Sequence, residues 1–591
     1  MKSNTTGIWL VIAALLAAAI WVLQNYFQSA PPGENLLFAG LRPDRVTSLQ
    51  VIPGGAREIS IVRTNKDWRL QKPFVYPAQA AAIESLLEAL QKLTPTDTLS
   101  PAEMSRRKDA EAEFGFDNPQ FTLDLADDDQ TWHVRVGKKT APGDGVYVRL
   151  VGAAGAFVTD PSWLQLLPHD AANWRDTTLV DVPALADWIV ITNGTRATEL
   201  RRDATNHLWH IVRPQPARAD NLRIVTALQQ LRSAKVSQFV NDAPNDLAAY
   251  GLAPATNDVW LGIGTNLLSA VHVGKDTTNG TVFARREGLN SVVATAREPL
   301  ALWRGTWNEF RDPNLLELTA PVAEIEVRGE NPFTLQQHGS NAWTMAGEKF
   351  PVNSERVEWF IKTLSNLRVA DFVKDNVTGP GLQDYGLDKP SRQITLRSAG
   401  GDTNSVIAQL LFGSFNTNEV FVKRADEDCV YGVSLADYGF VSLPGDYFRD
   451  PRVWNFSETN VAQVTLRQNG KTRQLLHTGT NEWSLTAGSG IINPPAVEET
   501  MHQLASLNVL AWIGRKFKDT ETGLATNNLS MTIELKSGEK YAVDFGGPVS
   551  QAKLQTVFAV VTLEGERWAF IFPPGPCANV AQYLTIPADA P

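Results

Sequence analysis

The sequence predicts an α+β protein: an N-terminal transmembrane helix followed by four tandem α+β repeats of about 136 residues. Each repeat is expected to hold antiparallel strands and one amphipathic helix. The main observation is a motif of an aromatic residue, a glycine and an apolar residue. It recurs at Gly115, Gly251 and Gly386, and Thr522-Gly523-Leu524 is a divergent fourth form. Such a fixed spacing indicates one structural unit written several times.

Two further landmarks keep the same spacing. A tryptophan precedes each of these glycines by 40 to 47 residues, and the four are Trp68, Trp209, Trp343 and Trp483. Three repeats end in an aromatic-Arg-Asp triplet, and the charged members are Arg175 and Asp176, Arg311 and Asp312, and Arg449 and Asp450. The fourth repeat lacks the triplet, as expected of a terminal repeat with no successor to join.

These landmarks divide the 591 residues into six parts. Domains of about 100–150 residues are typical, so several compact repeats suit this length better than one core. The predicted parts are a cytoplasmic tail and transmembrane anchor at 1–30, a linker at 31–45, and repeats at 46–183, 184–318, 319–456 and 457–591.

The composition limits the classes of function. Hydrophobic residues make up 43% of the chain, which is enough to build packed cores. The net charge is −10 and no long basic run occurs, which argues against nucleic acid as a partner because phosphate binding needs a concentrated positive face. Two cysteines, Cys429 and Cys577, cannot form a disulfide framework. Two separate thiols and one bridge between the last two repeats are both open.

The N-terminal segment predicts a membrane anchor. Residues 7–23 carry no charge, and residues 24–27 extend the run towards the length that spans a bilayer core of about 30 Å. The alternative is a cleaved signal peptide, but the run exceeds the ~7–15 apolar residues usual there. Lys2 precedes the run, and no Lys or Arg follows it until Arg42. The positive-inside rule therefore places a single-pass protein in the inner (cytoplasmic) membrane, with its N-terminus inside and its bulk periplasmic or extracytoplasmic.

The first half of each repeat predicts strands followed by a helix. In the first repeat, residues 46–52 and 58–63 are strand-like runs separated by a Pro-Gly-Gly turn, and a third strand carries Trp68. A helix then follows Pro77, because apolar residues from Ile83 to Leu93 recur at helical spacing. The other repeats place the same pattern after Asp220, after Asn353 or Ser354, and after Pro494-Pro495.

The second half of each repeat predicts further strands. In the first repeat they cover residues 121–125, 132–136 and 145–149, and a short helix-like segment at 161–167 follows. The glycine of the aromatic-Gly-apolar motif is expected to adopt a positive φ. The aromatic residue before it is expected to pack on the helix of the repeat.

The recurring residues favour structural roles, with a functional alternative for each. The four tryptophans are interpreted as core residues, and a ligand platform is the alternative. The glycine turns are interpreted as conformational requirements, and a ligand-clamping loop is the alternative. The Arg-Asp doublets are interpreted as pins between repeats, and an anion site is the alternative.

The sequence predicts no catalytic, cofactor-binding or metal-binding residues, and therefore no enzyme and no cofactor. His207 and His210 flank Trp209 in an expected strand, where their rings would point to opposite faces. Asn469-Gly470-Lys471-Thr472 is interpreted as a hairpin turn and not as a phosphate loop. Asp127-Asp128-Asp129 is interpreted as a solvated turn. A site formed between repeats would leave no such motif.

The landmarks in this order resemble domain of unknown function family 4340. The resemblance rests on the anchor, the tryptophan strand, the helix, the Phe/Tyr-Gly-Leu/Phe-Asp-x-Pro turn, the Tyr/Phe-Val-Arg/Lys strand and the closing Arg-Asp, over residues 46–456. It implies an association with ABC-type transporters similar to the gliding-motility export system. It brings no catalytic residues.

Three hypotheses of function follow. The first is a membrane-anchored, non-enzymatic accessory subunit whose repeats bind the permease or auxiliary subunits of an ABC-type transporter. The second is a tethered extracytoplasmic module that binds a glycan or a peptide. The third is a hydrolase with a site between repeats. A transporter ATPase and permease encoded beside this chain would favour the first.

Overall fold

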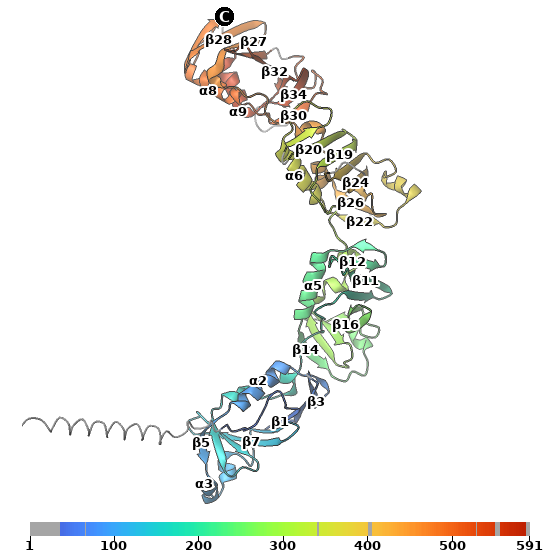
Figure 1. Ribbon diagram of the computed structural model, residues 1–591, viewed down its shortest axis with the longest axis vertical. Coiled ribbons are helices and arrows are strands. Elements are labelled where there is room, and N and C mark those ends of the chain that lie inside the picture. The colour runs from blue at the N-terminus through green and yellow to red at the C-terminus, as the bar shows by residue number, and fades with distance from the viewer. Residues whose placement is uncertain are drawn as a thin grey trace, which may run out of the picture. The chain divides into compact units, whose positions relative to one another are not determined.

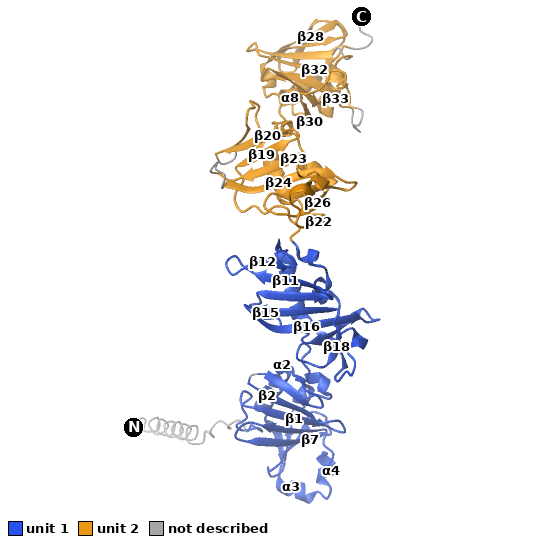
Figure 2. Ribbon diagram, turned by 90° about the vertical axis from the view of Figure 1, so that its right-hand side faces the viewer, with its two compact units in different colours: residues 1–311 blue, residues 312–591 orange. Residues whose placement is uncertain are grey.

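A computed structural model describes residues 36–65, 67–339, 342–399, 405–526, 529–549 and 556–586. The chain forms two compact units, residues 1–311 and 312–591 (Figure 2). Each unit contains two sheets, and each sheet lies within one predicted repeat. The described part of the chain is therefore mostly β-sheet with a few helices, arranged as four similar antiparallel sheets.

The first unit contains two nine-stranded sheets. The first has the order β4-β3-β2-β1-β6-β7-β8-β9-β5 and the second the order β13-β12-β11-β10-β15-β16-β17-β18-β14. The strands of the first are β1 Ser48–Pro53, β2 Ile59–Thr64, β3 Asp67–Lys72, β4 Tyr76–Pro77, β5 Pro95–Leu99, β6 Phe121–Ala126, β7 Thr131–Lys139, β8 Val146–Leu150 and β9 Ala156–Thr159. Those of the second are β10 Trp188–Asn193, β11 Arg196–Arg202, β12 Trp209–Arg213, β13 Ala217–Arg218, β14 Val236–Asn241, β15 Asn257–Ile263, β16 Asn266–Asp276, β17 Thr281–Arg286 and β18 Val292–Ala296.

The second unit contains two eight-stranded sheets of the same plan. Their orders are β21-β20-β19-β23-β24-β25-β26-β22 and β29-β28-β27-β31-β32-β33-β34-β30. The strands of the third sheet are β19 Glu324–Gly329, β20 Phe333–His338, β21 Ala342–Met345, β22 Asp371–Lys374, β23 Arg392–Arg397, β24 Val406–Phe415, β25 Glu419–Arg424 and β26 Val430–Ser434. Those of the fourth are β27 Val461–Gln468, β28 Lys471–Gly479, β29 Glu482–Ala487, β30 Ala511–Gly514, β31 Leu529–Leu535, β32 Lys540–Pro548, β33 Val557–Leu563 and β34 Glu566–Ile571.

One main helix in each repeat connects the two edges of its sheet (Figure 1). In the first repeat this helix is α2, Ala80–Gln91, which follows the edge strand β4 and precedes the opposite edge strand β5. Such a connection must cross one face of the sheet, and an apolar stripe suits that path. Ile83 and Leu90 of α2 are accordingly buried in one core with Leu49 of β1. The equivalent helices are α5 Asn221–Ser233, α6 Ser354–Ser365 and α8 Pro494–Ala505.

Side-chain caps fix the start of three of these helices. Asp220 accepts a hydrogen bond from the backbone N–H of Arg223, Asn353 from that of Arg356, and Asn493 from that of Ala496. Each cap satisfies one of the backbone donors that the first turn leaves unpaired. Of the two predicted caps of α6, the structure uses Asn353.

The connection back to the middle of the sheet runs over the other face. In the first repeat it contains α3 Pro101–Arg106 and α4 Ala110–Phe114. The ring of Phe114 lies 4.7 Å from that of Tyr147, in a small cluster separate from the core under α2. Val146 and Val148 belong to the α2 core, so Tyr147 between them points to the opposite face.

This placement corrects one prediction. The aromatic residue before the motif glycine was expected to pack on the helix of its repeat, but it packs on the sheet face that the helix leaves uncovered. Tyr250 and Tyr385 do the same, with ring centroids 5.2 Å from Phe283 and Phe421. The strand on which this aromatic residue packs is not part of the motif. The alternation of side chains along that strand decides on which face of the sheet the aromatic ring packs.

Each repeat contains a pair of glycines at which the backbone of the motif packs against a neighbouring strand. The motif glycines Gly115, Gly251, Gly386 and Gly523 all have positive φ, from 64° to 81°. A second glycine, on a neighbouring strand, lies against the backbone of the motif. In the third repeat this is Gly413, on which a Cβ would lie 2.1 Å from the carbonyl oxygen of Tyr385. The equivalents of Gly413 are Gly137, Gly274 and Gly546, each with a carbonyl oxygen at 2.1–2.2 Å. Side chains other than hydrogen are therefore excluded from both members of the pair.

A lead-in segment ahead of each repeat joins its core. Leu37 and Phe38 are buried with the first core, inside the range predicted to be a linker. The N–H of Leu37 donates to the carbonyl of Leu93, just beyond α2. Leu179, Leu315 and Val453 make the same bond in the later repeats. Leu179 and Val453 lie three residues after Asp176 and Asp450, so the second and fourth repeats are completed by residues next to the ends of their predecessors.

Several local predictions can be compared directly. Asn469 and Gly470 form the expected hairpin turn between β27 and β28, both with positive φ. His207 lies in a turn and not in the strand, because β12 begins at Trp209. Cys429 and Cys577 are not bonded to each other.

The predicted anchor and tail, residues 1–30, lie outside the described residues. Among the residues that the structure describes, no helix combines the length and apolarity needed to span a bilayer.

Candidate functional site

The four motif tryptophans lie inside the cores of their repeats. Trp68, Trp209, Trp343 and Trp483 are between 2% and 6% exposed. Each stands opposite the same position of the neighbouring strand, occupied by Arg63, Arg202, Gln337 and His477. Rings this deeply buried are not accessible platforms for a ligand.

Arg175 joins the two repeats of the first unit. It is 3% exposed and forms a bidentate ion pair with Asp242 of the second repeat, at 2.5 and 3.3 Å. Its guanidinium also lies over Tyr76 of the first repeat and Phe239 of the second, at 4.3 and 3.6 Å from the ring centroids. The neighbouring Asp176 pairs with Arg286 of the second repeat at 3.1 Å. Paired charge and aromatic faces together compensate the burial of a guanidinium.

Arg449 makes the equivalent junction in the second unit. It is 2% exposed, and its Nη2 donates to both carboxylate oxygens of Glu564 at 2.8 and 3.0 Å. The guanidinium lies 4.2 Å from the Trp568 ring and 5.2 Å from that of Phe350. Burial lowers the pKa of Arg449 from its ordinary value, and the hydrogen bond to Glu564 opposes that shift. The backbone carbonyl of Asp450 accepts a hydrogen bond from Trp512.

Arg311 and Asp312 stand at the boundary of the two units. Arg311 is 3% exposed, and its guanidinium lies 4.5 Å from the centroid of the Trp307 ring. Asp312 accepts a hydrogen bond from the backbone N–H of Asn314 at 2.9 Å. Within their own units, these residues thus repeat the aromatic stacking and the turn seen at Arg175 and Asp176.

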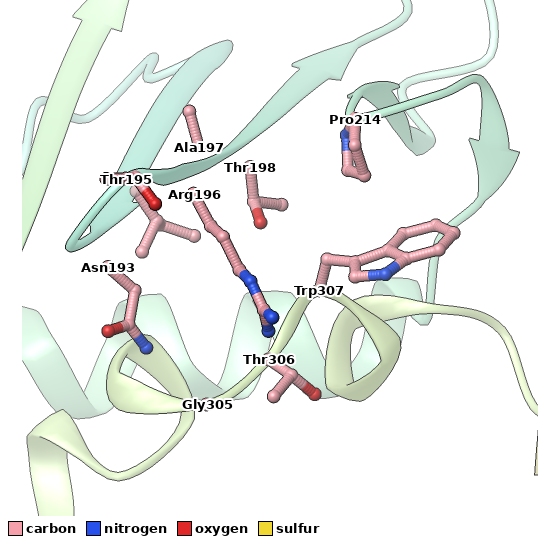
Figure 3. Close-up of a pocket in the computed structure, with 10 residues that line it drawn as sticks. Asn193, Thr195, Arg196, Ala197, Thr198, Pro214, Gly305, Thr306 and Trp307 are labelled. Carbon is pink, nitrogen blue, oxygen red and sulfur yellow. The ribbon is translucent and has the colours of Figure 1, made fainter.

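A pocket opens in the second repeat, beneath the hairpin of β10 and β11 (Figure 3). Its volume is about 420 Å³, within the range of about 300–1,000 Å³ that small-molecule sites occupy. The opposite wall comes from the loop that enters η6, Trp307–Phe310. The lining residues are Ile191, Asn193, Thr195, Arg196, Ala197, Thr198, Pro214, Gly305, Thr306 and Trp307.

Strand register explains why the pocket is open. Thr198 stands opposite Ile191 of the adjacent strand. The residues at this register position in the first, third and fourth repeats are Ile59, Phe333 and Arg473. All three are larger and are buried in their own repeats. The second repeat therefore has a smaller side chain, Thr198, at a position where the others have a larger one.

The third and fourth repeats use that position for packing. The Phe333 ring lies 5.4 Å from the Phe448 ring. The Arg473 guanidinium donates to the carbonyls of Thr585 and Ile491, at 2.5 and 3.0 Å. The other pocket wall also differs, since Ala171 and Gly445 stand where the second repeat has Trp307, three residues before the triplet aromatic.

Arg196 supplies a cation at this pocket. It is exposed, and in the described residues its guanidinium makes no hydrogen bond or ion pair. In Figure 3 its side chain extends from β11 past Thr198, and in this view its guanidinium ends above Thr306, between Asn193 and Trp307. Thr195, Thr306 and Asn193 add hydroxyl and amide groups. The pocket thus combines apolar side chains, an indole and an unpaired positive charge, an arrangement suited to binding.

A charged cluster lies elsewhere on the second sheet. His272 bonds through Nδ1 to Asp258 at 2.6 Å and through Nε2 to Glu287 at 2.5 Å. The hydrogen bond to Asp258 raises the pKa of His272, with Glu287 adding to the rise and burial opposing it. The same bond lowers the pKa of Asp258. Both ring nitrogens are occupied, and no group of metal-ligating side chains is found among the described residues.

The pocket was not predicted from the sequence, whose recurring residues mark packing and repeat junctions instead. The segments between these positions and the tryptophans differ in length, so aligning the repeats on their tryptophans places Thr198 opposite Arg57, Pro332 and Thr472. Only the strand register places Thr198 where the first and third repeats have Ile59 and Phe333.

The fold defines the protein as a tandem array of antiparallel sheets, each crossed by one helix. The chain belongs to the family described as a domain of unknown function, DUF4340, whose model matches residues 68–205, 209–348 and 343–530. Each match begins at one of the motif tryptophans and runs past a repeat junction, and the third also includes Trp483. A search of curated proteins finds no match for the chain.

Proposed function

We propose that this protein is a membrane-anchored, non-enzymatic accessory subunit of an ABC-type, gliding- or export-like transport system. Its repeats would stand outside the inner (cytoplasmic) membrane and bind the permease or auxiliary subunits. The family resemblance is the source of the transporter association, and the uncharged run of residues 7–23, which residues 24–27 extend, is the source of the anchor.

The observation that carries this proposal is the use of the recurring charged residues. Arg175 and Arg449 are buried in ion pairs and aromatic stacking between neighbouring repeats. Residues so placed hold repeats together and are not available for chemistry on a substrate. An array of linked repeats offers extended surfaces, which suit binding to other proteins.

Co-purification tests the proposal. The full-length protein, tagged at its C-terminus, is isolated from its own cells in mild detergent, and the bound proteins are identified by mass spectrometry. We expect a transporter permease, ATPase or auxiliary subunit to be enriched over an unrelated single-pass membrane protein carrying the same tag. No enrichment of any such subunit in replicate isolations would contradict the proposal.

A second candidate function is a tethered module that binds a peptide or a glycan. The pocket of the second repeat favours it, because Arg196 and Trp307 line a cavity at a position where the other repeats carry a larger buried side chain. Binding of the purified full-length protein to a peptide or glycan array would separate this function from the first. The two are compatible if the bound molecule is the cargo of the transporter.

A further inference from the structure

We infer that the second-repeat pocket binds a carboxylate attached to an apolar or aromatic body. This inference rests on the second candidate function and not on any transporter partner. It names the chemistry of the ligand, which the family assignment leaves open.

Arg196 is the reason to expect a carboxylate on the ligand. A guanidinium presents a planar set of donors that matches a carboxylate in bidentate geometry. Other arginines of the same repeat already have partners: Arg201 pairs with Glu199, and Arg223 with Glu309. Arg196 has none among the described residues, and its side chain lies at the pocket (Figure 3).

The other residues that line the pocket are the reason to expect an apolar group on the ligand. Ile191 forms part of the floor, Pro214 and Trp307 form one side, and the methyl group of Thr198 adds to the apolar surface. Arg311 lies over the Trp307 ring. An indole favours a flat or apolar partner. A ligand that places an anion at Arg196 and an apolar group beside Trp307 satisfies both.

Two sources supply this chemistry: a free acid, and the last residue of a peptide with an apolar side chain. Both present a carboxylate next to an apolar group, and the cavity of about 420 Å³ has room for either. The probes separate the sources. N-acetyl-phenylalanine represents the free acid, and a pentapeptide ending in phenylalanine represents the peptide.

The experiment uses full-length protein in detergent and ligand-observed NMR. The probes are N-acetyl-phenylalanine, its amide, the pentapeptide with a free or amidated C-terminus, and glucuronate. We expect each free acid with an apolar body to bind about 10- to 100-fold more tightly than its amide, the ratio typical of a charge-assisted hydrogen bond. Tighter binding of the pentapeptide than of the acetylated residue identifies the peptide as the source, and the reverse identifies a free acid.

Three variants locate the binding. R196Q removes the cation and should reduce the ratio of acid to amide affinity to about one, while T198I introduces the side chain of the first repeat and should abolish binding of both. The matched control is R57Q, at an exposed arginine two residues before Ile59, as Arg196 is two residues before Thr198; it should change nothing. Thermal melts of T198I establish that the variant is folded.

Several results would overturn the inference. They are no binding by any acid, binding of glucuronate alone, or binding that R196Q and folded T198I both leave intact. None of them bears on the transporter association, which is tested by co-purification of the wild-type protein.

Discussion

At the scale of single residues, the main feature is that arginines at the ends of repeats are buried. Arg175, Arg311 and Arg449 are nearly fully buried, although arginine is rarely so placed unless paired. The sequence predicted pins between repeats from their positions. It could not identify the partners, because Asp242 and Glu564 lie at different places in their repeats: the first follows an edge strand, and the second lies in a turn between β33 and β34.

Removing Arg449 should destabilise the second unit. R449A leaves Glu564 without the buried cation and removes one of the guanidinium groups that lie over Trp568, so we expect a loss of about 3–5 kcal/mol in the free energy of unfolding. Chemical denaturation of the wild type and the variant measures it. R452A, at an exposed arginine of the same segment, is the control and should change stability by less than about 0.5 kcal/mol. A double variant with E564Q should lose less than the sum of the single variants.

His272 should make the stability of the first unit depend on pH. Its folded pKa is raised, so its stabilising contribution is complete below the unfolded value of about 6.5 and is lost as pH rises through the folded value. The partner Asp258 has a lowered pKa, so its contribution is lost only in acid. The unfolding free energy of the wild type minus that of H272Q should therefore fall as pH rises above about 6.5.

The measurement is chemical denaturation of the first unit's transition at several pH values. H210Q, at an exposed histidine of the same repeat, serves as the control for loss of an imidazole. A difference curve for H272Q that stays flat, or that rises with pH, would refute the assigned role.

At the scale of elements, local patterns were informative and long-range pairings were not. The helical spacing of Ile83 to Leu90 predicted α2, and Asn-Gly predicted the β27–β28 hairpin. The order of strands across each sheet was not predictable, because the main helix joins opposite edges and local sequence does not encode which edge it reaches. The pocket was not predicted because only the strand register equates Thr198 with Ile59 and Phe333, and because its second wall comes from the distant loop that carries Trp307.

The glycine pair should be a sensitive element of each repeat. G413A would place a Cβ 2.1 Å from the carbonyl oxygen of Tyr385, so we expect a loss of about 2 kcal/mol or more in the stability of the second unit. The control is G439A in α7, Leu435–Val441, where no atom lies within 4 Å of the added Cβ. This change should stabilise by up to about 1 kcal/mol, because alanine favours the helix. Equal effects of the two substitutions in denaturation experiments would count against the close-packing role.

At the scale of the whole molecule, the described residues form two units of two repeats each. The repeat architecture could be predicted because the landmarks recur at a fixed spacing. The lead-in segments could not, because Leu37 and Phe38 precede the first recognisable strand and carry no motif of their own.

The predicted anchor gives a direct test at this scale. Deletion of residues 1–30 should move the protein from the membrane fraction to the soluble fraction, because the deleted segment contains most of the uncharged run. Fractionation with alkaline carbonate, followed by immunoblotting, measures the distribution. The full-length protein should resist carbonate extraction, and a full-length protein found in the soluble fraction would refute the anchor.

The ion pairs between repeats have a consequence for biosynthesis. Arg175 is synthesised 67 residues before Asp242, and Arg449 115 residues before Glu564. At about 5–20 residues per second these intervals last roughly 3–13 s and 6–23 s. During that time the nascent repeat ends in a guanidinium whose carboxylate partner has not yet been synthesised. One repeat of a pair is therefore completed only after much of the next has been translated.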